Sequence, residues 1–467
     1  MSEVERTPRF VPPLDEGFRP LVLRNRAFRA DVAASGVAAP LVIALERSDG
    51  TCSRYDTQVF PASSPEFPRS LAYVERLVKS LLWARGGWKV TIGGSPEIGA
   101  ALQGAYAPGG ARAFDAQIMG RIYERAFTVV SCDIADVPAA AESTVALGGH
   151  LDGCRIGVDL GASDRKVAAV IDGEAVYSEE VVWDPRPRTD PQFHFDEIMT
   201  AIRTAAAYLP RVDAVGVSSA GVYINNLIRV ASLFRGVPDA LFETRVKRLF
   251  FEIQQALGGI PLVVVNDGEV TALAGAMSLD DTAVIGVAMG SSEAAGYVTP
   301  EGALTNWLNE LAFVPIDANP AAPADEWSGD IGCGVQYLSQ QCVGRLIPAS
   351  GLPVEMTLGL PERLKAVQAL MAAGDERAIP LYRTIGVYLG YALAHYADFY
   401  AIRHGLILGR VTSGEGGAII LEQAKQVLAE EFPDLGAITL ALPDEASRRV
   451  GQAIAAASLP ALAKEVV

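Results

Sequence analysis

The chain has 467 residues, half of them hydrophobic, and its 39 basic and 55 acidic side chains give a formal charge of −16. This length exceeds one ordinary domain core and predicts two or three domains. The acidic balance, which no Lys/Arg block offsets, argues against a nucleic-acid partner. No apolar run reaches membrane-spanning length, and residues 1–10 do not resemble a signal peptide, so we expect no membrane association.

Five cysteines and four histidines are dispersed through the sequence, and no two cysteines form a CxxC pair. An odd number of scattered thiols is typical of a reducing compartment, so we expect a cytoplasmic protein. The same dispersal predicts that there is no structural zinc site.

The first 150 residues predict a separate α/β domain. Residues 1–20 contain four prolines and predict an extended or loosely packed segment. We then expect two strands within 40–60 around the Asp49-Gly50 turn, a helix at 69–85 and a strand at 89–92. Residues 134–153, rich in Ala, Gly, Pro and acidic side chains, predict a linker. Nothing in this part of the sequence assigns it a function.

Strand and helix patterns alternate from residue 151 onward. We expect, in chain order, a hairpin at 155–182, a helix at 195–208, a strand at 214–218, a long helix at 239–257, strands at 261–265 and 283–288, helices within 361–402, and a strand at 406–408. This alternation predicts parallel sheets flanked by helices, which is an α/β fold with its ligands at the carboxyl ends of the strands.

Three of the predicted strand ends carry small-residue turns suited to phosphate. The first holds Asp159, Gly161 and Ser163, which place a carboxylate and a hydroxyl beside an unobstructed backbone. An ordinary hairpin bend explains the same residues equally well. The other two turns, at 289–292 and 409–417, are read either as phosphate and adenosine loops or as plain connections, and their candidate residues are Gly290, Ser291, Ser292, Gly409, Gly414, Gly416 and Gly417.

Asn266 and Asp267 follow a buried strand directly. A carboxylate at such a strand end can take the proton from a hydroxyl that attacks phosphorus, and a neighbouring amide can orient a polyol. The alternative is that the two residues cap the helix that follows them.

The order and spacing of these segments resemble the ROK family (repressors, open reading frames and sugar kinases) of the actin–hexokinase superfamily. The resemblance spans about residues 154–460. The segment DLGASD at 159–164 resembles the DxGGTK motif, which contacts phosphate, and VVND at 264–267 resembles V-x-N-D, whose Asp is the catalytic base. The resemblance therefore implies that Asp267 is the general base, that Asn266 binds sugar, and that Asp159 holds Mg²⁺ together with ATP.

Further segments extend the resemblance. The glycine-rich sugar loop is similar to VGVSSAGV at 215–222, the second phosphate loop to GSSEAAG at 290–296, the sugar-binding E-x-G-H to ELAF at 310–313, and the adenosine loop to LGRVTSGEGG at 408–417. The resemblance implies that the sugar contacts Glu310, Ser219 and Gln336 in addition to Asn266.

Several positions depart from the family pattern. Asp164 stands at the position of the motif lysine, although Arg165 and Lys166 follow it, and Ser292, Ala294 and Ala295 replace glycines of the second phosphate loop. Phe313 stands where a histidine would bind both zinc and sugar. The family's zinc cluster is reduced to Cys333, with Val335 at the position of a sugar-binding glutamate. These departures imply that the zinc module is lost.

The sequence thus predicts a two-lobed actin/hexokinase-like (ribonuclease H-like) fold, with lobes at 151–275 and 276–467, after an additional α/β domain at 1–150. The predicted function is an ATP- and Mg²⁺-dependent kinase for a hexose-like sugar. The alternative is a catalytically impaired sensor that binds sugar or nucleotide without transferring phosphate. A third hypothesis is a structural protein that keeps the fold without a working pocket. The sequence leaves open whether the protein forms a homo-oligomer.

Overall fold

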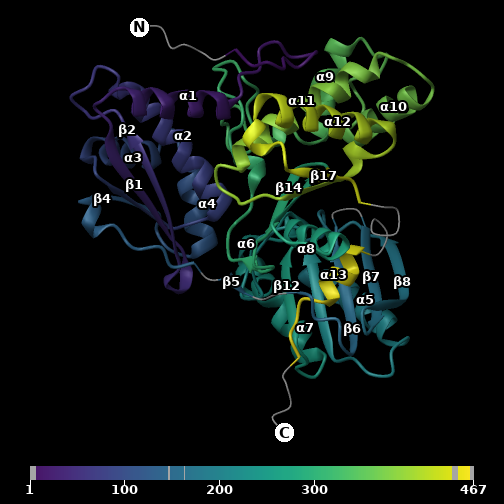
Figure 1. The fold of residues 1–467 in the computed structure, drawn as a ribbon. Coiled ribbons are helices and arrows are strands. Elements are labelled where there is room, and N and C mark those ends of the chain that lie inside the picture. The colour runs from purple at the N-terminus through teal and green to yellow at the C-terminus, as the bar shows by residue number, and fades with distance from the viewer. Residues whose placement is uncertain (1–6, 143, 146–147, 162–163, 444–450, 463–467) are drawn as a thin grey trace.

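The computed structural model describes residues 7–142, 144–145, 148–161, 164–443 and 451–462. Figure 1 shows an N-terminal α/β domain beside two further lobes, each built on its own sheet. The first lobe carries a five-stranded sheet and the second lobe a six-stranded sheet, whereas the N-terminal domain carries a four-stranded one.

The N-terminal domain has a sheet of strand order β2-β1-β3-β4, in which β3 and β4 are parallel. Its elements are α1 (Leu21–Ala34), β1 (Ala39–Glu46), β2 (Cys52–Val59), α2 (Phe67–Arg85), β3 (Lys89–Gly93), α3 (Pro96–Tyr106), α4 (Ala113–Tyr123) and β4 (Thr128–Cys132). The strands predicted at 40–60 and 89–92 and the helix at 69–85 are confirmed.

The proline-containing segment at 7–20 is closely packed, so the prediction of loose packing is wrong. Phe18 is 0% exposed and packs against the rings of Tyr337 and Tyr388, with centroids 5.5 and 4.8 Å away. The backbone amide of Leu14 donates to Oγ1 of Thr384 at 3.1 Å. The segment therefore lies along the second lobe, and its apolar side chains are buried there although its backbone forms no regular element.

The first lobe has the strand order β12-β9-β6-β7-β8, with β6, β9 and β12 parallel and β7 and β8 antiparallel. Its elements are β6 (Cys154–Leu160), β7 (Asp164–Ile171), β8 (Glu174–Val182), α5 (Pro191–Ala206), β9 (Ala214–Ser219), β10 (Val222–Ile224), β11 (Leu227–Val230), α6 (Asp239–Thr244), α7 (Leu249–Ala256) and β12 (Leu262–Asn266). The predicted hairpin, the helix at 195–208 and the strands at 214–218 and 261–265 are confirmed.

The single long helix predicted at 239–257 is wrong. The helix α6 ends at Thr244, and α7 begins at Leu249 after a 3₁₀ turn at Val246–Arg248. Arg245 leaves helical geometry with φ −123°. In the turn, Lys247 pairs with Glu124 of the N-terminal domain, a contact that the local hydrophobic pattern does not reveal.

The second lobe has the strand order β17-β16-β13-β14-β15-β5. Its elements are β5 (Thr144–Val145), α8 (Asp267–Leu279), β13 (Val284–Met289), β14 (Glu293–Val298), β15 (Leu304–Thr305), α9 (Gln340–Ser350), α10 (Leu360–Ala372), α11 (Ala378–Tyr396), β16 (His404–Leu408), α12 (Glu415–Glu431) and β17 (Thr439–Ala441). The strands predicted at 283–288 and 406–408 and the helices within 361–402 are confirmed.

Two short elements lie outside the lobes that their sequence positions suggest. The strand β5, from the segment predicted as a linker, pairs with β15 at the edge of the second-lobe sheet. The helix α13 (Gln452–Ala457), near the C-terminus, lies against the first-lobe sheet (Figure 1). Gly157 of β6 permits this contact, because a Cβ atom there would lie 1.7 Å from the carbonyl oxygen of Ala453.

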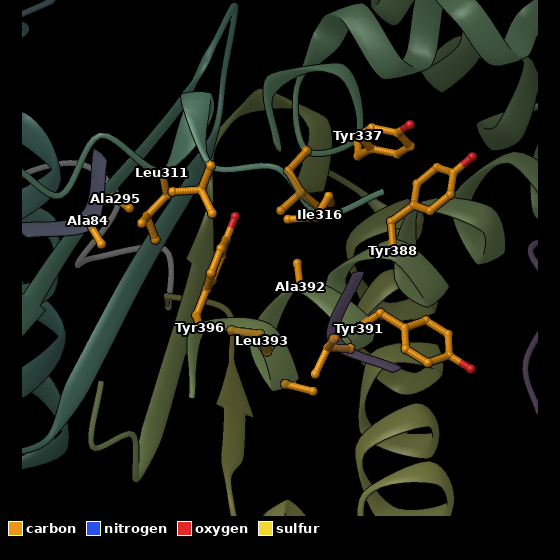
Figure 2. Packing of buried hydrophobic residues seen from close by; sticks show 14 of the residues in the cluster. Ala84, Ala295, Leu311, Ile316, Tyr337, Tyr388, Tyr391, Ala392, Leu393 and Tyr396 are labelled. Atoms are coloured by element: carbon orange, nitrogen blue, oxygen red, sulfur yellow. The ribbon is translucent and has the colours of Figure 1, made fainter. Parts of the chain in front are cut away.

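The N-terminal domain and the second lobe share one hydrophobic core, whereas most of the first lobe has a separate one. Figure 2 shows part of the shared core, in which Ala84 of α2 belongs to the same cluster as Ala295 of β14, Leu311 and Tyr396. The N-terminal domain is thus part of the same packed unit as the second lobe.

The helix α8 is held against β14 by two glycines. A Cβ atom on Gly268 would lie 2.1 Å from the carbonyl oxygen of Ala295, and one on Gly296 would lie 2.0 Å from the carbonyl oxygen of Gly268. Any side chain at either position would push the first turn of α8 away from the strand. This close contact fixes the place of Asp267, the first residue of that turn.

We expect Gly268→Ala to lower the free energy of unfolding by about 1–3 kcal/mol, since the added methyl group must displace backbone. Denaturant unfolding followed by circular dichroism measures the effect. Gly104→Ala is the matched control, because this glycine lies in α3 with nothing within 4 Å of an added Cβ, and it should stabilise α3 by about 0.5–1 kcal/mol. A Gly268→Ala protein as stable as the wild type would contradict the packing described here.

Candidate active site

The carboxyl ends of three first-lobe strands meet at one edge of the sheet. The register pairs Leu160 of β6 with Ser219 of β9, and Ser219 with Asn266 of β12. The sequence motifs that follow these strands are therefore brought together, as parallel pairing requires.

Asn266 caps the helix α8, as the alternative reading of this motif predicted. Its Oδ1 accepts from the amide of Gly268 at 2.7 Å, and its Nδ2 donates to the carbonyl of Gly221 at 2.7 Å. Both ends of the amide are thus engaged in holding the loop after β9 to the start of α8. Asp267 follows at the positive end of the helix, where a carboxylate is favoured.

Asp159 lies close enough to Asp267 for its charge to affect that carboxyl. Asp159 is 7% exposed and accepts from Oγ of Ser218 at 2.7 Å. Burial raises the pKa of Asp159, and the Lys166 charge opposes that shift. Burial, together with the Asp159 charge, raises the pKa of Asp267 to about 6. Asp267 is therefore ionised at neutral pH and still able to accept a proton.

Glu310, at the start of a 3₁₀ turn in the second lobe (Leu311–Phe313), extends this acidic group across the lobes. Burial and the Asp267 charge raise the pKa of Glu310 to about 7. The structure therefore brings Asp159, Asp267 and Glu310 into one region, although they come from three separate segments.

Two further carboxylates, Glu269 and Glu293, were missed by the sequence reasoning. Burial raises the pKa of Glu269 to about 8. Glu293 is 3% exposed, accepts from the hydroxyl of Tyr396 at 3.0 Å, and has a pKa raised to about 8, mainly by burial. An acidic residue at the start of the apolar strand β14 was the available signal for Glu293.

The other two predicted sugar contacts, Ser219 and Gln336, form hydrogen bonds with neighbouring side chains. Ser219 is fully buried and accepts from the hydroxyl of Tyr223 at 2.6 Å. Burial raises the pKa of Tyr223, and Asp267 adds to the shift, so this tyrosine lies within reach of the Asp267 charge. Gln336 donates from Nε2 to Gln341 at 2.6 Å, within the second lobe.

Gly161, at the start of the first predicted phosphate turn, is held by two hydrogen bonds of its backbone. The amide of Gly161 donates to the carbonyl of Asp164 at 3.0 Å, and its carbonyl accepts from Nε1 of Trp183 at 2.8 Å. Ser163 lies outside the described residues. Successive side chains of β7 alternate in direction, so Arg165 pairs with Glu197 while Lys166 lies on the other face.

The turn between β13 and β14 is compact. The amide of Gly290 donates to the carbonyl of Ser292 at 2.9 Å, and the carbonyl of Gly290 accepts from the amide of Gln340 at 2.9 Å. The side chains of Ser291 and Ser292 are exposed to solvent. Their hydroxyls are therefore accessible to a ligand.

The glycines at 409–417 divide into two groups. Gly409 has φ +99°, and a Cβ atom there would lie 2.4 Å from the carbonyl oxygen of Met289, so this glycine permits the loop to pass the end of β13. Gly414 has φ +72° and precedes α12. At Gly416 and Gly417 an added Cβ would meet the ring of Tyr382 and the backbone of Thr412, so close helix packing explains these two.

The start of this loop lines a cavity of about 490 Å³ that lies between the lobes. The lining includes Lys166 from the first lobe, Thr271 and Ser278 from α8, and Gly409, Arg410, Thr412 and Ser413. Thr271 follows Asp267 by four residues and so lies on the same face of α8, one turn further along. Lys166 and Arg410 give the cavity positive charge, and Arg410 also pairs with Asp164 at 3.5 Å.

Among the described residues, no group of three or more His, Cys, Asp and Glu side chains is arranged to hold a metal ion by itself. In the same part of the chain, no helix combines the length and apolar character that a bilayer crossing requires.

Comparison with solved structures identifies the architecture. A ROK family glucokinase from Streptomyces griseus, solved with glucose and AMPPNP, matches with a TM-score of 0.51 at 20% identity, over 66% of this chain and 99% of its own. A ROK hexokinase from Thermus thermophilus matches with a TM-score of 0.51 at 18% identity, over 66% of this chain and 97% of its own. A ROK family transcriptional regulator, a homologue of the E. coli MLC protein, matches with a TM-score of 0.52 at 20% identity, over 66% and 78%.

No family model and no curated protein matches the sequence. The solved structures show that the protein has the two-lobed actin/hexokinase-like fold, which confirms the predicted fold class. More narrowly, the arrangement is the one found in ROK proteins, so the expected resemblance is confirmed at the level of the fold. The matches cover 66% of the chain, which leaves room for the additional N-terminal domain.

We expect Glu293→Gln to stabilise the protein at pH 9 and to change little at pH 5. The folded-state pKa of Glu293 is raised to about 8, so its contribution to stability is present below about pH 4.5 and is lost as the pH rises through 8. Each pKa unit corresponds to about 1.4 kcal/mol, and glutamine resembles the neutral acid. Glu422→Gln, at an exposed position on α12, is the control. Equal effects of Glu293→Gln on the unfolding midpoint at the two pH values would contradict the burial of this carboxyl.

Proposed function

We propose that the protein is a kinase of ROK type that transfers the terminal phosphoryl group of ATP to a hydroxyl of a hexose-like sugar. The observation that carries the proposal is the position of Asp267, at the end of a buried strand, within reach of the Asp159 and Glu310 charges. The named activities of the solved ROK kinases support the same class of substrate.

Asp267 is proposed as the general base. A carboxyl with a pKa of about 6 is ionised at neutral pH and is more basic than an ordinary aspartate. The acceptor oxygen forms a bond to the terminal phosphorus, its proton passes to Asp267, and the bond from that phosphorus to the bridging oxygen breaks to release ADP.

The acceptor is proposed to lie against Glu310, with further contacts to Ser219 and Gln336. Glu310 offers carboxylate oxygens to sugar hydroxyls. Asn266 contributes by fixing the first turn of α8, because both ends of its amide are engaged, and we place it at the edge of the sugar.

The cavity between the lobes fits a nucleotide. Its loop at Gly409–Ser413 provides backbone for the adenosine end, and Lys166 and Arg410 provide positive charge for phosphates. We propose that Gly161, Ser163 and the exposed Ser291 and Ser292 complete the phosphate contacts with Gly290. The glycines at 414, 416 and 417 shape the loop and the start of α12.

Asp159 is the residue proposed to hold Mg²⁺. Its buried carboxylate, at the end of β6, is an oxygen ligand of the kind that Mg²⁺ prefers, and an ion that keeps several waters and is shared with phosphates needs few ligands from the protein. When bound, Mg²⁺ neutralises the charge that develops on the phosphates.

We expect purified protein with ATP, Mg²⁺ and a panel of sugars to release ADP and form a phosphorylated sugar, detected by mass spectrometry. Asp267→Asn should lower kcat by about 10²–10⁴, the usual contribution of a general base. Asp280→Asn is the matched control at the opposite end of α8, where Asn tolerates the same left-handed backbone. ATP hydrolysis that needs no sugar and survives Asp267→Asn would contradict the proposal. Sugar binding without any phosphotransfer would support the sensor instead.

The acidic limb of the pH profile provides a separate test. Asp267 and Glu310 must both be ionised, and their raised pKa values are about 6 and 7. We therefore expect kcat/KM for the sugar to rise between pH 5 and 8 with two coupled ionisations, and Glu310→Gln to leave one. A flat profile over this range at saturating ATP would rule out ionisation of these groups as a requirement.

A further inference from the structure

The loop that carries Glu310 is bound by the N-terminal domain. The amide of Asn309 donates to the carbonyl of Ala84 at 2.9 Å, and the amide of Glu310 donates to the carbonyl of Trp83 at 3.0 Å. Both carbonyls belong to the last turn of α2, where helix carbonyls have no partner within the helix. The C-terminal turn of α2 thus receives the backbone of this loop.

Asn309 is held from two directions. It has φ +53°, a left-handed backbone conformation that asparagine tolerates better than most residues. The hydroxyl of Tyr400 lies 3.0 Å from Oδ1 of Asn309 and 3.3 Å from the carbonyl oxygen of Ala84, so its single proton is shared between these two acceptors. Contacts from both the N-terminal domain and the second lobe therefore hold Asn309 in place.

The indole of Trp83 fixes the other end of the loop. It stacks on the ring of Phe313 with centroids 4.1 Å apart and an interplanar angle of 26°. Trp83 is 2% exposed, and its Nε1 donates to Oδ1 of Asp115 at 2.8 Å. Trp83 therefore contacts this loop at two places. Its carbonyl oxygen accepts from the amide of Glu310, and its indole stacks on Phe313, three residues further along the chain.

A buried ion cluster holds Asp115 in place. The ammonium of Lys79 is fully buried, 3.4 Å from Oδ1 of Asp115 and 2.8 Å from Oδ2 of Asp330. Arg76 and Arg112 also pair with Asp330, each at 2.7 Å. Asp330 belongs to the second lobe, so this cluster joins the domain to that lobe and includes the Asp115 that binds Trp83.

From these contacts we propose that the N-terminal domain forms part of the acceptor site, with Trp83 as the positioning residue for Glu310. This inference rests on the proposed function. Residues 67–85 carry no catalytic motif, and we assign them a role in binding the sugar. We assign them no role in binding the nucleotide, because no residue of this domain is among the described lining of the cavity proposed for it.

The test compares KM for the sugar with KM for ATP in Trp83→Leu, which loses the ring stack, and Trp83→Phe, which loses only the indole donor. An aromatic pair and a hydrogen bond each contribute about 0.5–1.5 kcal/mol. We expect KM for the sugar to rise about tenfold in Trp83→Leu and about threefold in Trp83→Phe, with KM for ATP unchanged. Trp88→Phe is the matched control, because Trp88 lies in the same domain and its Nε1 contacts Arg47 instead of the loop.

A double-mutant cycle with Glu310→Gln separates positioning from general damage. If Trp83 acts through Glu310, adding Trp83→Phe or Trp83→Leu to Glu310→Gln should raise KM for the sugar little further. Unchanged sugar KM in Trp83→Phe, equal rises in both KM values, or additive effects in the cycle would overturn the inference. Trp83→Phe decides the matter if Trp83→Leu does not fold. A wild-type protein that neither binds nor phosphorylates a sugar would instead contradict the proposed function itself.

Discussion

The close approach of α8 to β14 is the constraint on which the rest of the site depends. Gly268 and Gly296 let two backbones meet where any side chain would collide, and Asn266 fixes the start of the helix by hydrogen bonds at both ends of its amide. Asp267 is consequently held between the first-lobe sheet and the second lobe. Its carboxyl lies in a buried environment beside Asp159, which raises its pKa into the range useful for proton transfer at neutral pH.

The three parts of the protein are joined unequally. The N-terminal domain shares its core with the second lobe and is tied to it by the Lys79–Asp330 cluster. Its link to the first lobe includes the pairs that Glu124 makes with Arg229 and Lys247 and the packing of first-lobe Val222, Ile224 and Val230 against the shared core.

Local patterns predicted most of the strands, and with them the positions of the candidate residues that follow these strands. The apolar composition of the residues before Asn266 predicts a strand, and the parallel pairing of strands then determines which strand ends meet. Contacts between segments that are distant in the sequence could not be predicted from these local patterns. The packing of Phe18 on Tyr337 and Tyr388, the break between α6 and α7, and the burial of Glu293 all depend on partners far away in the sequence. The contact of Trp83 with the Glu310 loop, across more than 200 residues, is of the same kind.

As the proposed general base, Asp267 must face the acceptor hydroxyl beside the terminal phosphate. A crystal structure with a non-hydrolysable ATP analogue, Mg²⁺ and a sugar that binds tests it most directly. We expect a sugar hydroxyl within about 2.6–3.2 Å of the Asp267 carboxylate and in line with the terminal phosphorus. Nucleotide bound in the cavity between the lobes with the sugar held elsewhere, out of reach of Asp267, would contradict it.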